Sequence, residues 1–276
     1  MKAGKRLRIG IALGNFIDLP ESSSGWRASE RESYDAVARA GYGAVQGGSR
    51  ERCAEAGLRL IGNGVVATAS AAMEFARHWK DVGAEAATCI AGFGYESDAE
   101  ADEIAYAVCE ASEQTGLPLY LETHRGSITQ DAWRTVQMLG RVPSLLLNGD
   151  FSHWFTGQEM AYGDFDRRLA FLAPVFERTC FLHGRIGNRC CLQVPVNDGE
   201  DELVRPFEQM WTAVTRAFVD RVDGPSDLWF CPELLGTEYQ YARVFAGREE
   251  TDRWEQAGVL VGVARRCAEA AGLSTE

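Results

Sequence analysis

Long apolar runs are missing from this sequence: no stretch of its 276 residues approaches the roughly 20 apolar residues that a membrane-spanning helix requires. The N-terminus is basic, but the apolar run that follows is short and is broken by Gly14, Asn15 and Asp18, which makes a poor secretion signal. The sequence therefore predicts a soluble, cytoplasmic protein with no membrane partner.

Cysteine pairs of the Cys-x-x-Cys type are also missing, although the chain has 8 cysteines. Such a pair is the usual core of a cysteine zinc site, so a site of that kind is disfavoured. Scattered cysteines in a chain without a signal sequence indicate free thiols in a reducing compartment. The adjacent Cys190 and Cys191 are interpreted as ordinary loop thiols rather than as a redox pair.

Positive charge is scarce, because 28 Lys and Arg residues face 40 Asp and Glu residues, which leaves a formal net charge of −12. An acidic surface repels phosphate backbones, so we expect no nucleic-acid partner. A local basic pocket could still hold one phosphate or carboxylate.

What the sequence does contain is a regular alternation of short apolar runs with longer amphipathic stretches. We predict strands at 7–13, 44–47, 58–66, 86–93, 117–124, 144–149, 180–185 and 228–234. We predict helices at 30–40, 71–82, 99–115, 131–139, 165–176, 206–222 and 251–271. Alternation of this kind is typical of parallel strands joined by crossover helices.

Eight strand–helix units predict a single α/β domain over 1–276, a (β/α)8 TIM barrel, for which about 250 residues are typical. A doubly wound open sheet is the alternative, but no Gly-x-Gly-x-x-Gly follows the first strand. The longest irregular stretch, near 187–204, follows the seventh strand. A loop at that position lies over the catalytic face of a barrel, so it is either a substrate-covering lid or a solvated acidic loop.

Four successive apolar strands end in a carboxylate or an imidazole, carried by Glu122, Asp150, His183 and Glu233. A charge at a buried strand end is costly without a partner. Three carboxylates and one imidazole suit a divalent cation such as Mn2+, Mg2+, Co2+ or Zn2+. The alternative is that each of these residues forms a salt bridge to Arg125, Arg185 or a lysine.

Strand parity adds a second group of side chains near these ends. Residues two apart in a strand point to the same side, so His124 shares a face with Glu122, and Arg185 shares one with His183. His153 follows the sixth strand and is expected at the rim. The fourth histidine, His78, lies within a predicted helix and is expected to be structural.

The ordered motifs Glu-Thr-His at 122–124, Asp-Phe-Ser-His-Trp at 150–154, His-Gly-Arg at 183–185 and Pro-Glu-Leu at 232–234 carry a resemblance. The chain resembles the xylose isomerase-like TIM barrel family, the sugar phosphate isomerase/epimerase superfamily. The resemblance is good over residues 117–235, and over 1–85 only the rhythm of the strands supports it. It does not single out one substrate.

The resemblance implies roles for individual residues. Glu122, Asp150, His183 and Glu233 match the metal ligands of the family. Glu122 and Glu233 also match the two glutamates that move the proton in epimerases. His153 matches a histidine that in related epimerases contacts the substrate and sometimes the metal. The arginine of the His-x-Arg motif binds a substrate oxygen in one branch, and it is Arg185 unless Arg189 takes that role. Strand parity, rather than the resemblance, makes His124 a substrate-binding candidate.

The implied chemistry is isomerisation or epimerisation of a sugar, a polyol or a small hydroxy-ketone through an enediolate, with manganese among the expected metals. A dehydratase or lyase is the runner-up, because the same intermediate can lose a β-hydroxyl. An abasic-site endonuclease and a non-catalytic sugar-binding barrel are weaker alternatives. The expected partner is a small carbohydrate-like molecule, and the resemblance implies a homodimer or a homotetramer.

Weaker candidates lie at other strand ends. Asn15, Gln46 and Asn63 could bind hydroxyl groups. Glu96 could join the pocket or begin the next helix, and Trp154 could form an apolar wall for a sugar ring or belong to the core.

Overall fold

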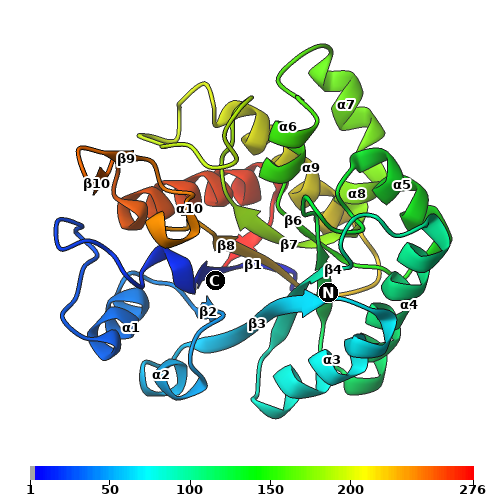
Figure 1. Ribbon diagram of the computed structural model, residues 1–276, viewed down its shortest axis with the longest axis horizontal. Helices are drawn as coiled ribbons and strands as arrows, with labels where there is room; N and C mark the ends of the chain where they lie inside the picture. The colour runs from blue at the N-terminus through cyan, green and yellow to red at the C-terminus, as the bar shows by residue number, and fades with distance from the viewer. Residues whose placement is uncertain (1–3) are drawn as a thin grey trace.

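The computed structural model describes residues 4–276. Its barrel strands are β1 (Arg6–Ala12), β2 (Ala44–Gln46), β3 (Arg59–Val66), β4 (Ala86–Ala91), β5 (Leu119–Glu122), β6 (Leu147–Gly149), β7 (Thr179–Gly184) and β8 (Asp227–Pro232). Each pairs in parallel with the next in sequence, and β8 pairs with β1, where Leu228 lies opposite Leu7. The strands thus close a barrel at the centre of the molecule, as Figure 1 shows. This confirms the predicted (β/α)8 TIM barrel.

Helices surround the barrel (Figure 1). They are α1 (Glu30–Arg39), α2 (Arg50–Glu55), α3 (Ala72–Asp81), α4 (Asp98–Thr115), α5 (Ala132–Arg141), α6 (Ser152–Gly157), α7 (Phe165–Phe171), α8 (Ala173–Arg178), α9 (Arg205–Asp220) and α10 (Arg253–Ala271). Short 3-10 turns lie at η1 (Leu13–Asn15), η2 (Ala69–Ala71) and η3 (Thr237–Tyr239). Among the residues that the structure describes, no helix has the length and apolar character needed to cross a bilayer.

The barrel strands are buried on both faces, since the interior covers one face and the helices cover the other. All six residues of β7 are buried, for example. This double burial explains why the strands appear in the sequence as continuous apolar runs rather than as an alternating pattern. Trp211 of α9 illustrates the packing of the outer layer, because its ring meets Phe230 of β8 edge-on at 5.1 Å between centroids.

Helix ends follow the local signals of the sequence. Ser97 and Glu100 form a reciprocal capping box at the start of α4, an arrangement that satisfies backbone N–H groups left free in the first turn. Gly116 follows the end of the same helix with φ 63°, a left-handed conformation that glycine adopts without steric cost.

Several predicted boundaries are wrong. The helix predicted at 165–176 is two helices, α7 and α8, because Pro174 in the first turn of α8 cannot donate a backbone hydrogen bond to continue the helix before it. The helix predicted to end at Leu139 continues through Gly140 to Arg141. The six-residue helices α2 and α6 are too short to produce a periodic pattern and were not predicted.

Two short strand pairings lie outside the eight barrel strands. An antiparallel hairpin joins β9 (Val244–Phe245) to β10 (Arg248–Glu249) in the segment after β8, and it projects from one side of the barrel in Figure 1. The strand β11 (Ser274–Thr275) pairs with the first residues of β1. The stretch 187–204 is irregular, as predicted, and Gln193 ties it to the segment after β8 through two hydrogen bonds with the backbone of Leu235.

Candidate metal centre and adjoining cavity

Four side chains predicted from the strand ends meet at the carboxyl end of the barrel. Glu122 is the last residue of β5, Asp150 directly follows β6, His183 lies near the end of β7, and Glu233 directly follows β8. One potential ligand atom of each lies within 4.8 Å of those of the other three. The parallel barrel brings all four strand ends to the same face, which is why residues 111 positions apart in the sequence become neighbours.

The His183 ring lies at the centre of this group and is 1 % exposed. Its Nδ1 atom is 3.2 Å from Glu233 Oε2, 3.6 Å from Glu122 Oε2 and 3.8 Å from Asp150 Oδ2. One ring nitrogen therefore faces all three carboxylates. Its other nitrogen, Nε2, is 2.9 Å from the side-chain oxygen of Gln46.

Arg185 brings a second positive charge into the same group. Its guanidinium is 2 % exposed, donates a hydrogen bond to Asp150 Oδ2 and places Nη2 2.9 Å from Glu233 Oε2. The salt bridges that the sequence left open as an alternative to metal binding are thus partly present. They engage Asp150 and Glu233, while among the described residues no lysine or arginine forms a salt bridge with Glu122.

The pKa values of this group reflect burial and mutual attraction. Burial raises the pKa of Glu122 to about 8, despite the opposing effect of His183. Burial alone would lower the pKa of His183, but the Glu233 and Glu122 carboxylates raise it to about 10. The pKa values of Asp150 and Glu233 are lowered because Arg185 and the histidines outweigh their burial. Near neutral pH two anions therefore face two cations, and Glu122 is protonated.

The donor set fits a divalent cation. Carboxylate oxygens and one imidazole suit the divalent ions from magnesium to zinc. Ligand oxygens lie about 2.0–2.2 Å from such an ion, so atoms on opposite sides of it lie roughly 4 Å apart, close to the spacing found here. Glu233 Oε2 is buried, and its nearest partners in the described part of the chain, Arg185 Nη2 at 2.9 Å and His183 Nδ1 at 3.2 Å, do not meet it in hydrogen-bond geometry. We therefore regard Glu122, Asp150, His183 and Glu233 as residues that could hold one metal ion.

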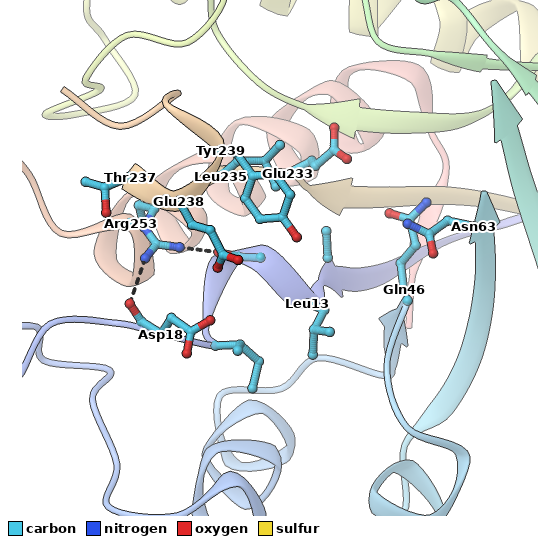
Figure 2. A pocket seen from close by; sticks show the side chains of 15 residues that line it. Leu13, Asp18, Gln46, Asn63, Glu233, Leu235, Thr237, Glu238, Tyr239 and Arg253 are labelled. Atoms are coloured by element: carbon cyan, nitrogen blue, oxygen red, sulfur yellow. Dashed lines mark hydrogen bonds between the residues drawn. The ribbon is translucent and has the colours of Figure 1, made fainter. Parts of the chain in front are cut away.

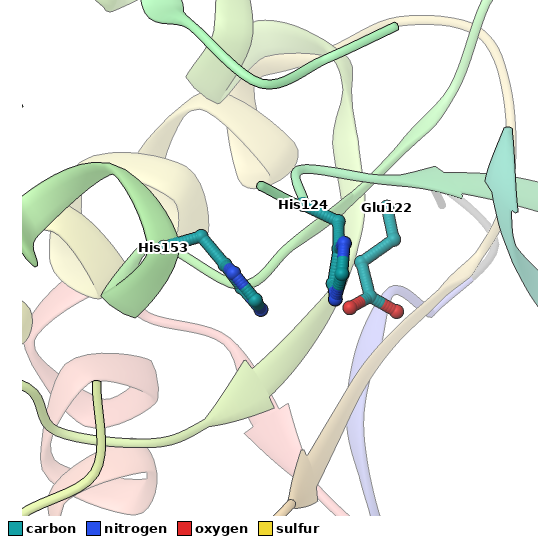
Figure 3. A group of neighbouring side chains, drawn as sticks. All are labelled: Glu122, His124 and His153. Carbon is teal, nitrogen blue, oxygen red and sulfur yellow. The ribbon is translucent and has the colours of Figure 1, made fainter. Parts of the chain in front are cut away.

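Two further histidines lie beside Glu122. His124 follows β5 and His153 lies in α6, and their ring centroids are 4.0 Å apart. Figure 3 shows both rings turned toward the Glu122 carboxylate. Burial lowers the pKa of His124, and it lowers that of His153 to about 3, so both imidazoles are neutral. His124 Nδ1 is buried and has no hydrogen-bond partner among the described residues.

His153, predicted on the rim just past the sixth strand, lies in the first turn of α6 and is buried. It is 1 % exposed, its Nδ1 atom accepts a hydrogen bond from the backbone N–H of Arg125, and its Nε2 atom is 3.2 Å from Arg185 Nη2. The helix α6, which was not predicted from the sequence, follows β6 closely and buries His153 together with Ser152, Trp154 and Phe155.

A cavity of about 390 Å³ adjoins the four-residue group, and its lining includes Glu233 of that group and Gln46, which contacts His183. Figure 2 shows Gln46 and Asn63 on one side of it, with Glu238 and Tyr239 on the other. The lining combines these polar groups with apolar side chains from the end of β1. The lining also includes the cationic side chain of Arg253. Its guanidinium donates two hydrogen bonds to the Glu249 carboxylate, at 2.7 and 3.0 Å, and further hydrogen bonds to the backbone oxygens of Gly14 and Asp18.

The weaker candidates have structural roles or border the cavity. Asn15 is buried and accepts a hydrogen bond from the Leu234 backbone at 2.8 Å, which supports the position of the neighbouring Glu233. Glu96 accepts hydrogen bonds from the Phe93 and Gly94 backbones in the turn before α4. Trp154 is fully buried and donates to the Thr129 backbone, so it belongs to the core.

Of the two arginines that the sequence left open, Arg185 lies in the group, whereas Arg189 is exposed and packs over Tyr162 at 4.9 Å. His78 is exposed in α3, and its ring meets that of Trp79 edge-on at 5.1 Å between centroids. Tyr241 was not predicted from the sequence, and its ring centroid lies 5.2 Å from the Arg185 guanidinium carbon and 5.9 Å from that of Arg125. No pattern marks Tyr241, because it lies in an irregular segment.

Comparisons with solved structures agree with this architecture. The chain resembles a probable 3-DHS dehydratase, AsbF, from Bacillus anthracis (TM-score 0.57, 14 % identity, 94 % of this chain and 97 % of that one). It resembles a xylose isomerase-like TIM barrel protein from Mycobacterium smegmatis in complex with magnesium (0.56, 13 %, 94 % and 98 %). It also resembles a sugar phosphate isomerase/epimerase from Parabacteroides distasonis (0.57, 11 %, 96 % and 94 %).

These similarities concern the fold, because the sequence identities are low. The chain is structurally similar to xylose isomerase-like TIM barrels, as its motifs suggested, and these neighbours include an isomerase/epimerase and a probable dehydratase. Searches with family models and against curated protein sequences find no match.

Proposed function

We propose that this chain is a divalent-metal-dependent enzyme that moves a proton next to the carbonyl group of a carbohydrate-like substrate, as an isomerase or epimerase. The observation that carries the proposal is the convergence of Glu122, Asp150, His183 and Glu233 within 4.8 Å at the carboxyl end of the barrel. That end is where TIM-barrel enzymes carry their active sites. Mn2+, Mg2+, Co2+ and Zn2+ all suit the four ligands.

A bound divalent cation would supply a Lewis acid that stabilises the negative charge developing on the carbonyl oxygen. The C–H proton beside that carbonyl must then go to a base. Glu122 and Glu233 extend from strands three places apart in the barrel, so their carboxylates approach a substrate from different directions. One carboxylate would remove the proton and the other would return it, to the same carbon in epimerisation or to its neighbour in isomerisation.

Three other side chains would support this proton transfer. Arg185 carries a positive charge beside both Asp150 and Glu233, which suits it to hold a substrate oxygen. His124 and His153 are neutral and lie against Glu122, where they would bind hydroxyl groups of the substrate. The adjoining cavity of about 390 Å³ has the size and polar lining of a site for a small hydroxylated molecule.

Dehydration is the second candidate. Loss of a β-hydroxyl needs a group that carries a proton to the leaving oxygen, in addition to the base. His124 lies beside Glu122, but its imidazole is neutral, so it would have to take up a proton before it could serve as that group. The mass of the product separates the two candidates, since elimination loses one water and isomerisation does not.

Elemental analysis of purified protein, followed by a screen of ketoses, inososes and keto-glycosides with each metal added, tests the proposal. Reactions are run in D2O, where proton transfer at carbon incorporates deuterium into the product. We expect turnover that chelator abolishes and Glu122→Gln removes. Glu110→Gln, exposed on α4, is the matched control and keeps full activity. A protein that binds no divalent ion, or whose turnover survives chelator, would refute the proposal.

A further inference from the structure

The His183 ring has one partner on the side away from the carboxylates. Its Nε2 atom lies 2.9 Å from Gln46 Oε1, across 137 positions of sequence, and both side chains are 1 % exposed. An amide oxygen can only accept, so the contact requires a proton on Nε2. The carboxylates all approach the other nitrogen, Nδ1, at 3.2 to 3.8 Å.

Thr88 determines which end of the Gln46 amide faces the histidine. Gln46 Nε2 donates to Thr88 Oγ1 at 2.8 Å, and Thr88 on β4 is itself 1 % exposed. With its nitrogen engaged there, the amide presents its oxygen to His183. The chain of contacts thus runs from β4 through β2 to β7, across the inside of the barrel.

Asn148 also approaches the ring but does not take the role of Gln46. Its Nδ2 atom is 3.2 Å from His183 Nδ1 and 3.3 Å from Nε2. Such equal separations place an atom over the ring face, because an atom in the ring plane at that distance from both nitrogens would overlap the carbon between them. Asn148 is therefore aligned with neither nitrogen, and Gln46 is the in-line partner of Nε2 in the described part of the chain.

We infer that Gln46, oriented by Thr88, is a positioning residue that keeps the proton of His183 on Nε2 and so presents Nδ1 as the metal-binding atom. The inference rests on the proposed function in one respect, namely that a cation binds at Nδ1. Partners of this kind fix the tautomer and the orientation of a ligating imidazole, and their loss typically costs 10–100-fold in metal affinity.

Removing the amide oxygen would leave the buried Nε2–H without an acceptor. Once His183 gives up one proton to bind a cation, the ring could then hold its remaining proton on Nδ1 instead, which blocks the nitrogen that faces the carboxylates. We expect Gln46→Leu to weaken Zn2+ binding by about 10–100-fold. Thr88→Val keeps the shape of its side chain and frees the amide to turn over, so we expect a smaller loss in the same direction.

The experiment measures Zn2+ affinity by chelator competition and the protonation of His183 by long-range 1H–15N correlation in the Zn2+-loaded protein. The chain has 4 histidines, so a His183→Asn spectrum assigns the signal. Gln46→Glu retains an acceptor at the same reach and should restore the Nε2-protonated pattern. Asn63→Leu is the matched control for affinity, since it borders the same cavity and does not contact the His183 ring.

The inference predicts a proton on Nε2 and Zn2+ on Nδ1 in the wild type. It also predicts weakened binding in Gln46→Leu with no change in Asn63→Leu. Wild-type affinity in Gln46→Leu, or Zn2+ on Nε2, would overturn the inference while leaving the proposed function intact. Failure of the wild type to bind Zn2+, Mn2+ or Mg2+ would overturn both.

Discussion

Arg185 and Glu233 form a buried ion pair at the carboxyl end of the barrel, with Nη2 2.9 Å from Oε2. The same guanidinium donates a hydrogen bond to Asp150. Without a metal, Arg185 therefore supplies much of the positive charge that two buried carboxylates require. A divalent cation bound beside Arg185 would also compensate the charge of these carboxylates. The stabilising effect of the arginine and that of the metal should therefore depend on each other.

Replacing Arg185 by methionine tests this linkage. The variant leaves Asp150 and Glu233 buried without their arginine, and breaking a buried pair in this way costs about 3–5 kcal/mol. We expect the metal-free variant to lose stability of that order in urea unfolding, and added Mn2+ to restore much of it because the cation replaces the missing charge. Arg189→Met, on an exposed residue, should change neither quantity. Equal destabilisation with and without Mn2+ would contradict the linkage.

Metal binding should release protons, because two of the proposed ligands hold protons in the metal-free site. Burial raises the pKa of Glu122 to about 8, and the neighbouring carboxylates raise that of His183 to about 10. Both groups must be deprotonated to coordinate, so the apparent affinity should rise with pH up to these values. Calorimetry in buffers of different ionisation enthalpy should give about two protons released at pH 7.

The variant Glu122→Gln provides the control for that measurement. An amide takes the place of the protonated carboxyl and has no proton to lose at this position, so one proton fewer should be released on binding. Titrations at pH 9, where only His183 remains protonated, should likewise show one proton fewer in the wild type. Binding without proton release at pH 7 would show that the metal-free site is already deprotonated.

The two glutamates should differ from the other ligands in their effect on catalysis. General bases contribute about 10²–10⁴-fold to a proton-transfer rate, so Glu122→Gln or Glu233→Gln should lower kcat by that order even when saturated with metal. If the two act on opposite faces of the substrate, each variant should still exchange deuterium into one epimer only. Deuterium exchange into both epimers by a single variant would assign both proton transfers to the remaining carboxylate.

The sequence predicted the barrel well because parallel strands buried on both faces leave continuous apolar runs. The same strand ends revealed Glu122, Asp150, His183 and Glu233, since a charge directly after such a run is conspicuous. The partners of these residues were harder to find. Gln46 contacts His183 only because closure of the barrel through β8 and β1 brings β2 within reach of β7, and no local pattern encodes that proximity.

Short helices and irregular segments were the other features that could not be predicted from the sequence. The helix α6 has six residues, too few for a periodic signal, and it is the element that buries His153. Tyr241 covers Arg125 and Arg185 from a segment without regular structure. Its hydroxyl accepts a hydrogen bond from Arg125 Nη2 at 3.4 Å, a contact between residues 116 positions apart that only the folded chain creates.

Asp252 should make the attachment of the loop after β1 sensitive to acid. Its Oδ1 accepts hydrogen bonds from Ser23 Oγ at 2.7 Å and Trp254 N at 3.0 Å, and its Oδ2 accepts from Ser24 N at 2.7 Å and Ser24 Oγ at 2.9 Å. Partial burial would raise the pKa of Asp252, but these hydrogen bonds lower it overall. A lowered pKa in the folded state stabilises the protein above the unfolded value of about 3.9, and this stabilisation is lost as the pH falls through the folded value.

Each Asp252 carboxylate oxygen accepts a hydrogen bond from a backbone N–H, Oδ1 from Trp254 and Oδ2 from Ser24. In Asp252→Asn one of these oxygens becomes an NH2 group, so one of the two backbone N–H groups loses its acceptor. We expect the variant to be less stable than the wild type by about 1–2 kcal/mol at pH 7. The difference should shrink in strong acid, where the wild-type carboxyl is protonated and meets the same conflict. Asp131→Asn is the matched control, because Asp131 accepts a single side-chain cap bond from Arg134 N, and asparagine caps helices equally well. Urea unfolding of both variants from pH 7 to pH 2.5 measures the effect, and a difference that stayed constant with pH would mean that the charge of Asp252 contributes nothing.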